Sequence, residues 1–212
     1  MHELIIKINN AIQKRQKADL ISSIEAAIEA GLDPNEIIND GLTAAMDIVG
    51  SEFSEGTIFV PEMLVSAMLM KEGLKLIKPL IASGDEEKKG KILIGTVKGD
   101  LHDIGKNIVV MMLEGAGFEV VDLGVDLSVE QLVAKVAEQK PQILGLSALL
   151  TTTMPEMKRT IIGLTEHGIR EQVKVMIGGA PLSQSFADSI GADGYAKDAS
   201  EAVKLARKLV AA

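Results

Sequence analysis

The chain has 212 residues, of which 47% are hydrophobic and 25% are charged, and its formal net charge is −8. This length accommodates one or two domains with a substantial core, and the acidic balance argues against a nucleic-acid partner, whose phosphates require a basic face. The absence of cysteine excludes disulfides, thiolate nucleophiles and cysteine-ligated zinc sites. Because the sequence has no long apolar run and no signal peptide, we expect a cytoplasmic protein without a membrane span.

Residues 1–83 have the apolar spacing of amphipathic helices and are expected to form a four-helix bundle. An N-cap residue, a proline and a glutamate at Asp33–Glu36 indicate one helix start, and Pro61 opens a further helix. The polar run that follows, residues 84–90, is predicted to be a linker between two domains. The first two apolar stripes comprise Leu4, Ile5, Ile8 and Ile12, and then Leu20, Ile21, Ile24 and Ile28.

Residues 91–212 change to an alternation of strands and helices. Strands are expected at 91–97, 118–123, 142–149, 173–177 and 194–197, and helices at 103–114, after Ser128, and at 155–165, 183–190 and 198–209. Five strand–helix units with nearly continuous apolar strands imply an α/β fold with a parallel, doubly wound, Rossmann-like sheet. The flavodoxin-like strand order 2-1-3-4-5 is the expected arrangement.

This strand order predicts a site at the carboxyl ends of the strands. Ligands of open α/β sheets bind there, at the switch in strand order, which here lies between the first and third strands. The loop that holds His102 follows the first strand and Ser147 ends the third, so the two are expected to be neighbours. Gly178 and Gly179 follow the fourth strand, which is next along the sheet.

His102 has the most distinctive chemistry at this edge. A neutral imidazole can donate a lone pair to a metal or a cofactor, and Asp100 could accept the other ring N–H and fix the tautomer. The alternative interpretation is a helix-start loop in which Asp100 caps the helix and His102 is only polar. Other chemistries fit less well. One histidine without cysteine partners cannot form a closed zinc site, a triad through Ser147 lacks the Gly-x-Ser-x-Gly elbow, and a phosphoacceptor receiver domain needs an aspartate where Ser147 stands.

Glycines and hydroxyl side chains accompany the histidine at the same edge. Gly105 would let the backbone pass close to a bulky ligand, as would Gly178-Gly179, although a glycine pair after a strand is also an ordinary turn. Ser147 and the run Thr151–Thr153 offer hydroxyls, which are often solvated or capping groups but here lie at the expected switch point.

Taken together, these residues resemble the cobalamin-binding domain of corrinoid proteins. The family pattern is Asp-x-His-x-x-Gly, then Ser-x-Leu, then Gly-Gly, and this chain has Asp100-x-His102-x-x-Gly105, Ser147-x-Leu149 and Gly178-Gly179. Here 41 residues separate Gly105 from Ser147, and 28 separate Leu149 from Gly178, which is similar to the spacing of the family. The helical half, with its segment 56–62, resembles the cap bundle of methionine synthase and of small methyl-carrying corrinoid proteins.

The resemblance implies specific roles for the residues around the histidine. His102 would be the lower axial ligand of the cobalt and would displace the dimethylbenzimidazole of the cofactor, which is the His-on, base-off state. Asp100 would hydrogen-bond to His102 and tune its proton affinity. Thr153, where many relatives have serine, would extend this relay, and Asp103 and Leu149 would also contact the cofactor.

Further residues would accommodate the rest of the cobalamin, again by resemblance. Ser147 and Thr151 would line the slot for the displaced nucleotide tail, and Gly105, Gly178 and Gly179 would make room for that tail. The upper, methyl-bearing face would be shielded by apolar residues of the helical cap, although residues at this spacing are as often part of a core. These candidates are Phe59, Met63 and Leu64.

The function implied by the resemblance is that of a methyl carrier in a methyltransferase system, so the chain would be a subunit of an enzyme system more than an enzyme alone. Co(I) would accept a methyl group from a substrate-specific methyltransferase, and methyl-Co(III) would pass it to a second methyltransferase whose acceptor is tetrahydrofolate or coenzyme M. A reductive activase is a further implied partner. The linker at 84–90 would act as a hinge for the cap.

Other functions stay open at this level. The small subunit of an adenosylcobalamin-dependent mutase shares the histidine motif and the sheet but would not normally need residues 1–83 as a cap. A cobalamin-dependent sensor or regulator usually carries a basic DNA-binding module, which this acidic chain lacks. A flavodoxin-like binding module without cobalamin is the remaining alternative. The sequence does not distinguish methanol, methylamines, betaines and aromatic methyl ethers as methyl donors.

Overall fold

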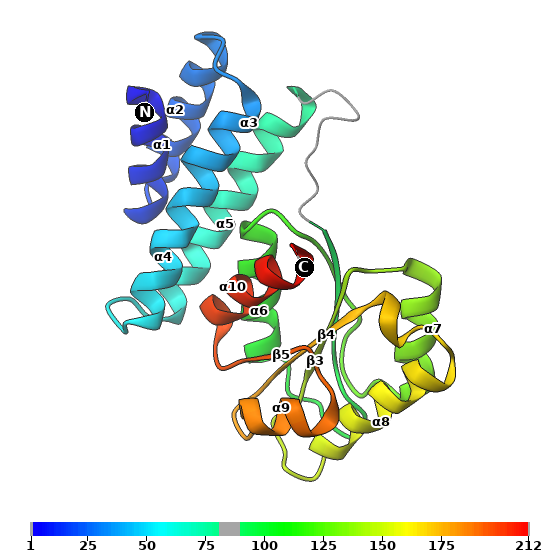
Figure 1. Ribbon diagram of the computed structural model, residues 1–212. Helices are drawn as coiled ribbons and strands as arrows, with labels where there is room; N and C mark the ends of the chain where they lie inside the picture. The colour runs from blue at the N-terminus through cyan, green and yellow to red at the C-terminus, as the bar shows by residue number, and fades with distance from the viewer. Residues whose placement is uncertain (1, 81–89, 212) are drawn as a thin grey trace. The chain divides into compact units, whose positions relative to one another are not determined.

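A computed structural model describes residues 2–80 and 90–211 of the chain. The contacts divide the chain into two compact units, residues 1–87 together with 114–117, and residues 88–113 together with 118–212. The first unit is helical and the second contains a sheet (Figure 1). The predicted linker, residues 84–90, lies outside the described residues apart from Gly90.

The helical unit consists of consecutive helices, as the apolar spacing predicts. The inward positions of the predicted stripes are buried, and Ile5, Ile8, Ile12, Leu20 and Ile24 are each 0% exposed. In the described residues the helices are α1 (Glu3–Gln13), α2 (Lys17–Glu29), a composite helix of α3 (Pro34–Glu36), η1 (Ile37–Thr43) and α4 (Ala44–Ser54), then α5 (Val60–Ile77) and the 3-10 turn η2 (Lys78–Leu80).

The composite helix contains a feature that the sequence analysis did not predict. Asp33 accepts a hydrogen bond of 2.9 Å from the Asn35 N–H, so this helix begins at the predicted cap. Residues Ile37–Thr43 then form a π-helix, whose turns hold more residues than α-helical turns. Gly41 lies in this segment, and a Cβ there would come within 3.1 Å of the Ile8 side chain. The π-turn thus coincides with a close approach of α1, which no periodicity in the sequence marks.

The sheet unit confirms the predicted flavodoxin-like order. In the described residues it contains a five-stranded parallel sheet with the order β2-β1-β3-β4-β5. Its central strands are largely buried, which is typical of parallel sheets covered on both faces. The third strand is shorter than predicted, because it ends at Ser147 and leaves Leu149 in the following loop. The strands are β1 (Lys91–Thr96), β2 (Glu119–Asp122), β3 (Ile143–Ser147), β4 (Lys174–Gly178) and β5 (Gly194–Ala196).

Helices cover both faces of this sheet (Figure 1). On one face lie α6 (Ile104–Gly115) and α10 (Ala199–Val210), and on the other α7 (Val129–Gln139), α8 (Met154–Glu166) and α9 (Gln184–Ile190). The predicted capping box at the start of α7 is present: the Ser128 hydroxyl accepts a hydrogen bond of 3.3 Å from the Gln131 N–H, and the Gln131 side chain accepts one of 2.9 Å from the Ser128 N–H. The 3-10 turn η3 (Arg170–Gln172), which precedes β4, was not predicted.

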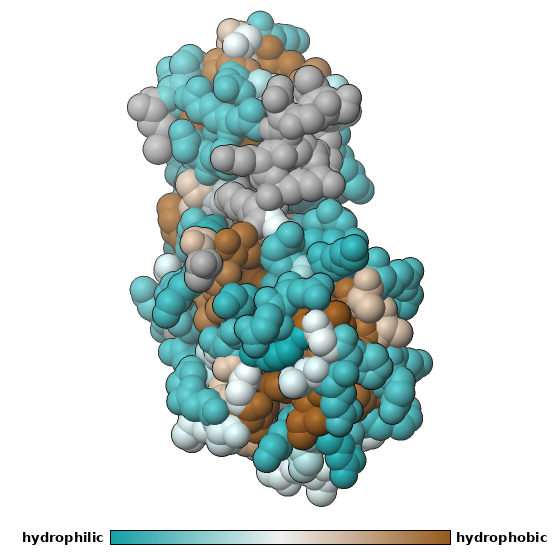
Figure 2. All heavy atoms as spheres, turned by 45° about the vertical axis from the view of Figure 1, so that its right-hand side comes forward, coloured by the Kyte–Doolittle hydropathy of each residue, from teal (hydrophilic) through white to brown (hydrophobic). Residues whose placement is uncertain are grey.

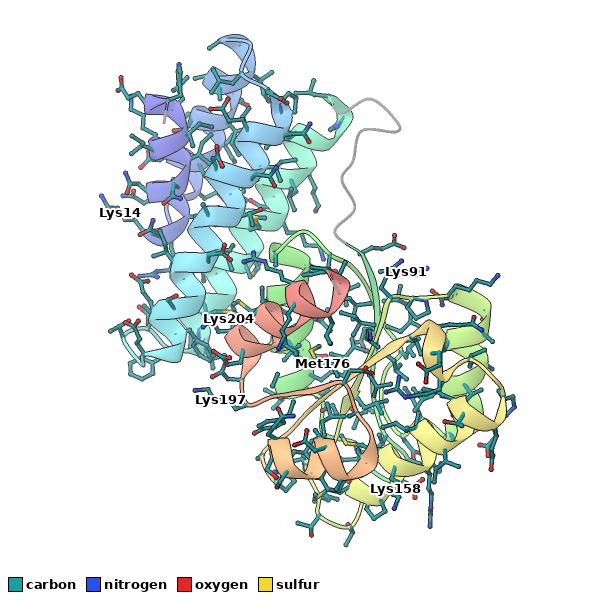
Figure 3. All side chains as sticks on the ribbon, in the orientation of Figure 1. Lys14, Lys91, Lys158, Met176, Lys197 and Lys204 are labelled. Carbon is teal, nitrogen blue, oxygen red and sulfur yellow. The ribbon has the colours of Figure 1, made fainter. Side chains whose placement is uncertain are left out.

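The surface mixes polar and apolar side chains. On the face drawn in Figure 2, small apolar areas lie among larger polar ones. In Figure 3, the labelled Lys91, Lys158, Lys197 and Lys204 come from different parts of the sheet unit and point away from the sheet, whereas Met176 of β4 is buried. Within residues 2–80 and 90–211, none of the helices combines the length and the apolarity that a membrane crossing requires.

The register of the sheet aligns the strand ends at which the site is expected. Thr96 of β1 pairs with Ser147 of β3, and Ser147 pairs with Gly178 of β4. The loops that follow these three strands therefore leave the sheet next to one another, at its carboxyl edge.

Candidate functional site

The carboxylate of Asp100 is the centre of the site. Its side chain is 0% exposed, and it lies in the loop between β1 and α6. One carboxylate oxygen, Oδ1, accepts hydrogen bonds from the His102 N–H at 3.0 Å and from the His102 ring Nδ1 at 2.7 Å. The other, Oδ2, accepts from the Leu149 N–H at 2.7 Å, the Leu150 N–H at 3.1 Å and the Thr153 hydroxyl at 2.8 Å. Asp100 thus joins the loop after β1 to the loop after β3.

These hydrogen bonds determine the charge of Asp100. Burial raises the pKa of its carboxyl group, but hydrogen bonds from the Leu149 N–H, from the backbone and ring of His102 and from the Thr153 hydroxyl outweigh burial and hold the pKa well below its usual range. Asp100 is therefore a carboxylate anion at neutral pH, and an anion can only accept hydrogen bonds.

The charge of Asp100 in turn determines the tautomer of His102. Because the carboxylate only accepts, Nδ1 must carry the proton, so the neutral ring has its lone pair on Nε2. The His102 side chain is 52% exposed, and Nε2 has no hydrogen-bond partner among the described residues. This arrangement presents a nitrogen lone pair on a ring that is oriented by a buried anion, as in metal-ligating histidines with a carboxylate behind them.

Exposed apolar side chains occur in the two loops that Asp100 joins. Leu101 and Ile104 flank it in the sequence and are 71% and 76% exposed, and Leu149 and Leu150 of the neighbouring loop are 43% and 41% exposed. Large apolar side chains that share an exposed area commonly mark a binding surface. We call these four residues the apolar rim.

The structure brings several of the predicted site residues together. Asp100, His102 and Thr153 form one hydrogen-bonded group, although Thr153 and Asp100 are 53 positions apart in the sequence. Ser147 is half-buried at the end of β3, and Thr151 is exposed in the following loop. The Leu150 N–H is a further partner of Asp100, and no sequence signal marks it because every residue except proline has such a donor.

Asp103 and the cap candidates differ in their surroundings. Asp103 lies at the start of α6, where its Oδ2 accepts a hydrogen bond of 3.1 Å from the Asn107 side chain. Phe59 and Met63 belong to the helical unit: Phe59 is 69% exposed just before α5, whereas Met63 is 0% exposed. Phe59 is therefore the one of this pair that offers an exposed side chain.

The three predicted glycines have different reasons to lack a side chain. At Gly179, where φ is +142°, a Cβ would lie 1.8 Å from the Ala148 carbonyl oxygen, so the packing of the protein itself requires glycine. At Gly178 a Cβ would lie 3.3 Å from the Ala196 carbonyl oxygen. At Gly105 a Cβ would meet nothing within 4 Å, so the absent side chain leaves open space next to the histidine loop.

The donor set of this site fits a corrinoid. In the described part of the chain, no three side chains of His, Cys, Asp or Glu gather in a way that could hold a metal ion. A single neutral imidazole suits a cobalt whose other ligands come from the corrin ring. The apolar rim and the open space at Gly105 are likewise compatible with a large, partly apolar ligand.

Both halves of the chain match family profiles described as "B12 binding domain". One profile matches residues 90–204, and a second profile matches residues 4–78. The two matched segments fall in the sheet unit and in the helical unit, and B12 is cobalamin.

Curated relatives match nearly the whole chain. "Dimethylamine corrinoid protein 1" of Methanosarcina acetivorans is 46% identical over 210 residues, which is 99% of this chain and 98% of the relative. "Trimethylamine corrinoid protein 2" of Methanosarcina mazei is 45% identical over 203 residues, which is 95% of this chain and 93% of the relative.

Solved structures also match nearly the whole chain. A cobalamin-binding protein from Desulfitobacterium hafniense is 31% identical, with a TM-score of 0.84 and coverage of 98% of both chains. The methanol:cobalamin methyltransferase complex MtaBC from Methanosarcina barkeri contains a chain that is 38% identical, with a TM-score of 0.85 and coverage of 99% of this chain and 80% of that chain. These matches include the helical half as well as the sheet.

Proposed function

We propose that this chain, which belongs to the family of B12-binding corrinoid proteins, is a methyl carrier of a methyltransferase system. Its family membership follows from two matched profiles and from relatives of about equal length that are 46% and 45% identical. The observation that carries the chemical part of the proposal is the pair of Asp100 and His102, whose 2.7 Å contact prepares one ring nitrogen for a metal.

Bound cobalamin would supply the cobalt on which the methyl group is carried. His102 would hold the cobalt through Nε2, because Nδ1 is committed to Asp100. The adjacent Asp100 anion would make the ring a stronger electron donor and so strengthen its bond to the metal. The Thr153 hydroxyl donates to Asp100 at 2.8 Å and so moderates the charge that the carboxylate presents to His102. The protein would thereby adjust how strongly the histidine binds the metal.

Other residues of the site would position the rest of the cofactor. The apolar rim, Leu149 included, would lie against the ring, and Asp103 would hold the start of α6 beside it. Ser147 and Thr151 would face the nucleotide tail. Gly105 would contribute the open space that its missing side chain leaves. Of the two candidates in the helical unit, Phe59 has the exposed side chain that contact with a cofactor requires, whereas Met63 is buried in the core of that unit.

The partners follow from the role of a carrier. A substrate-specific methyltransferase would deliver the methyl group, a second methyltransferase would remove it to tetrahydrofolate or coenzyme M, and a reductive activase would restore the reduced cofactor. We place these exchanges in the cytoplasm. The names of the relatives direct the first choice of donor to dimethylamine and trimethylamine, and the match to a methanol:cobalamin methyltransferase complex adds methanol.

Methyl transfer to the reconstituted protein tests this proposal. The full chain is loaded anaerobically with cobalamin, reduced, and mixed with a methyltransferase for each of the three donors, and the visible spectrum reports methylation. We expect methylation with at least one donor and a strongly reduced rate for His102→Ala. His167→Asn is the matched control, because His167 binds a backbone carbonyl at the end of α8 and lies outside this site.

Two results would contradict the proposal. Tight selection for adenosylcobalamin, with no methyl transfer from any donor, would replace the carrier with the small subunit of a mutase. Failure to retain any corrinoid would contradict both functions.

A further inference from the structure

The segment from the last residue of β2 to the approach of α7 contacts the histidine loop and the helix after it. We call residues 122–127 the brace. On the side before His102, the Asp126 carboxylate accepts a hydrogen bond of 2.8 Å from the Gly99 N–H, and the Asp126 N–H donates one of 3.0 Å to the Asp100 carbonyl oxygen. Asp126 therefore holds the backbone of Asp100 and of the residue before it.

The second contact of the brace lies after His102. Asp122 pairs with the Lys106 ammonium at 2.5 Å, and the Lys106 side chain is only 1% exposed in the first turns of α6. The remaining oxygen of Asp122 accepts a hydrogen bond of 2.9 Å from the Gly124 N–H, within the brace itself. The loop that carries His102 is thus tied to the same segment on both of its sides.

The backbone of Asp126 has a conformation that few residues adopt. Its φ is +54°, in the left-handed region, where aspartate and asparagine are tolerated better than other residues with side chains. Hydrogen bonds from the Gly99 N–H and from Lys98 hold the pKa of Asp126 below its usual range, so its carboxylate is charged at neutral pH. The Lys98 partner is an exposed ion pair, which contributes little, so the contact with Gly99 is the important one.

We propose that Asp126 is a positioning residue for His102. This positioning role depends on the proposed function only where it affects the binding of His102 to cobalt. Asp126 fixes the backbone of Gly99 and Asp100, and Asp100 in turn fixes the imidazole of His102. Without the Asp126 acceptor, the backbone of Gly99 and Asp100 would be held less firmly. The Asp100 carboxylate, which the Asp126 side chain does not touch, would then bind His102 and Leu149 less firmly.

Three variants separate the parts of this contact. Asp126→Gly removes the acceptor but accommodates the positive φ, so it causes no backbone strain. Asp126→Asn keeps an oxygen acceptor and tolerates the same φ, and should behave as the wild type. Lys98→Gln removes the ion pair alone. Asp198→Gly is the control for stability, because Asp198 accepts an equivalent hydrogen bond of 2.8 Å from the Glu201 N–H at the start of α10.

Amide hydrogen exchange of the cofactor-free full chain is the first measurement. We expect the His102 and Leu149 N–H groups, which donate to Asp100, to exchange about tenfold faster or more in Asp126→Gly, as loss of a hydrogen bond to a charged group predicts. Asp126→Asn, Lys98→Gln and Asp198→Gly should leave these rates within about twofold of the wild type. Unchanged rates in Asp126→Gly, or equal acceleration in Asp126→Asn, would overturn the proposal.

The visible spectrum of bound cobalamin is the second measurement. In the folded Asp126→Gly protein we expect a smaller fraction of histidine-ligated cofactor than in the wild type, with recovery in Asp126→Asn. Equal spectra for Asp126→Gly and the wild type would contradict the positioning role at cobalt. A wild-type protein without a histidine-ligated spectrum would contradict the proposed function instead, and the exchange rates would still decide whether Asp126 holds the Asp100 loop.

Discussion

Among the described residues, the two units of the molecule differ in how completely their buried polar groups are hydrogen-bonded. In the sheet unit, Asp100 is 0% exposed and both of its carboxylate oxygens accept hydrogen bonds from two loops. In the helical unit, Thr43 Oγ1 and Arg15 Nη1 are buried without a hydrogen-bond partner among the described residues. Buried polar groups are normally satisfied, and a satisfied network specifies one geometry. The contrast teaches that the buried polar group at the site of the proposed chemistry has its hydrogen bonds satisfied, whereas buried polar atoms away from that site can lack partners.

The backbones of the two units show the same contrast. In the sheet, β1 pairs in a regular parallel register with β2 on one side and β3 on the other, and this register aligns the loops of the site. The helical unit contains the π-helical segment Ile37–Thr43, which includes the Thr43 hydroxyl that has no hydrogen-bond partner among the described residues. The irregular backbone segment therefore lies in the helical unit, whereas the regular register lies in the unit that orients the imidazole of His102.

The largest expected effect comes from removing the Asp100 carboxylate. Asp100→Ala leaves the Leu149, Leu150 and His102 N–H groups without their acceptor, and we expect a loss of about 3 kcal/mol in the free energy of unfolding. Urea denaturation of the cofactor-free protein measures this loss. The exposed Asp188 of α9 supplies the control, since Asp188→Ala should cost within about 0.5 kcal/mol. Equal losses for the two variants would contradict the view that the hydrogen bonds of Asp100 hold the site together.

The brace should show an asymmetry between its two charged partners. Asp122→Ala leaves the buried Lys106 ammonium without its carboxylate, and we expect a loss of about 2–3 kcal/mol. Lys106→Met leaves Asp122, whose side chain is 37% exposed and can be solvated, so the loss should be about 1 kcal/mol or less. Thermal and urea unfolding give both values. A larger loss for Lys106→Met than for Asp122→Ala would contradict this interpretation of the buried pair.

Acid should remove stability through Asp100. Although burial raises the pKa of this carboxyl group, its hydrogen bonds hold the pKa well below the value of about 3.9 expected in the unfolded chain. The group therefore stabilises the fold fully above about pH 5, and this contribution is lost as the pH falls below about 4, by up to about 1.4 kcal/mol per pH unit. Unfolding measured at several pH values should show a steeper acid decline for the wild type than for Asp100→Asn. Parallel curves would count against the lowered pKa.

A pair of matched substitutions gives the smallest effect but compares the units directly. Thr43 and Thr153 are both buried, at 4% and 6% exposure, and valine has nearly the same shape as threonine. Thr43→Val removes a hydroxyl that has no partner in the described part of the chain, and should stabilise by about 1 kcal/mol. Thr153→Val removes a donor to Asp100 and should destabilise by about 1 kcal/mol. Changes of the same sign in the two variants would mean that the polar groups of the two units do not differ as described.

Local signals in the sequence were enough to predict much of the fold. The strands of the second half are short apolar runs bounded by turns, and this pattern predicts both their type and their parallel order. The Ser128 capping box and the Asp33 helix start were also identified, because each depends on residues within three positions of one another. The π-helix at 37–43 was missed because no local sequence signal marks it, although Gly41 within it approaches Ile8 of α1 closely.

The site was predictable in part for the same reason. Asp100 and His102 are two residues apart after a strand, so their contact could be expected from the sequence. The hydrogen bond from Gly99 to Asp126 could not be expected, because it depends on a left-handed backbone 27 residues away. Gly179 was interpreted as space for a cofactor, and the structure adds a requirement of the protein itself, the Ala148 carbonyl oxygen. Side-chain motifs at short range are visible in a sequence, whereas backbone partners are not.

The central claim is that His102 presents Nε2 to cobalt because Asp100 holds Nδ1. The most direct test is the visible spectrum of the wild type and of His102→Ala after anaerobic reconstitution with methylcobalamin. We predict a histidine-ligated spectrum for the wild type and a base-off spectrum for His102→Ala. Identical spectra for the two proteins would contradict the claim, because the cobalt would then have no contact with His102.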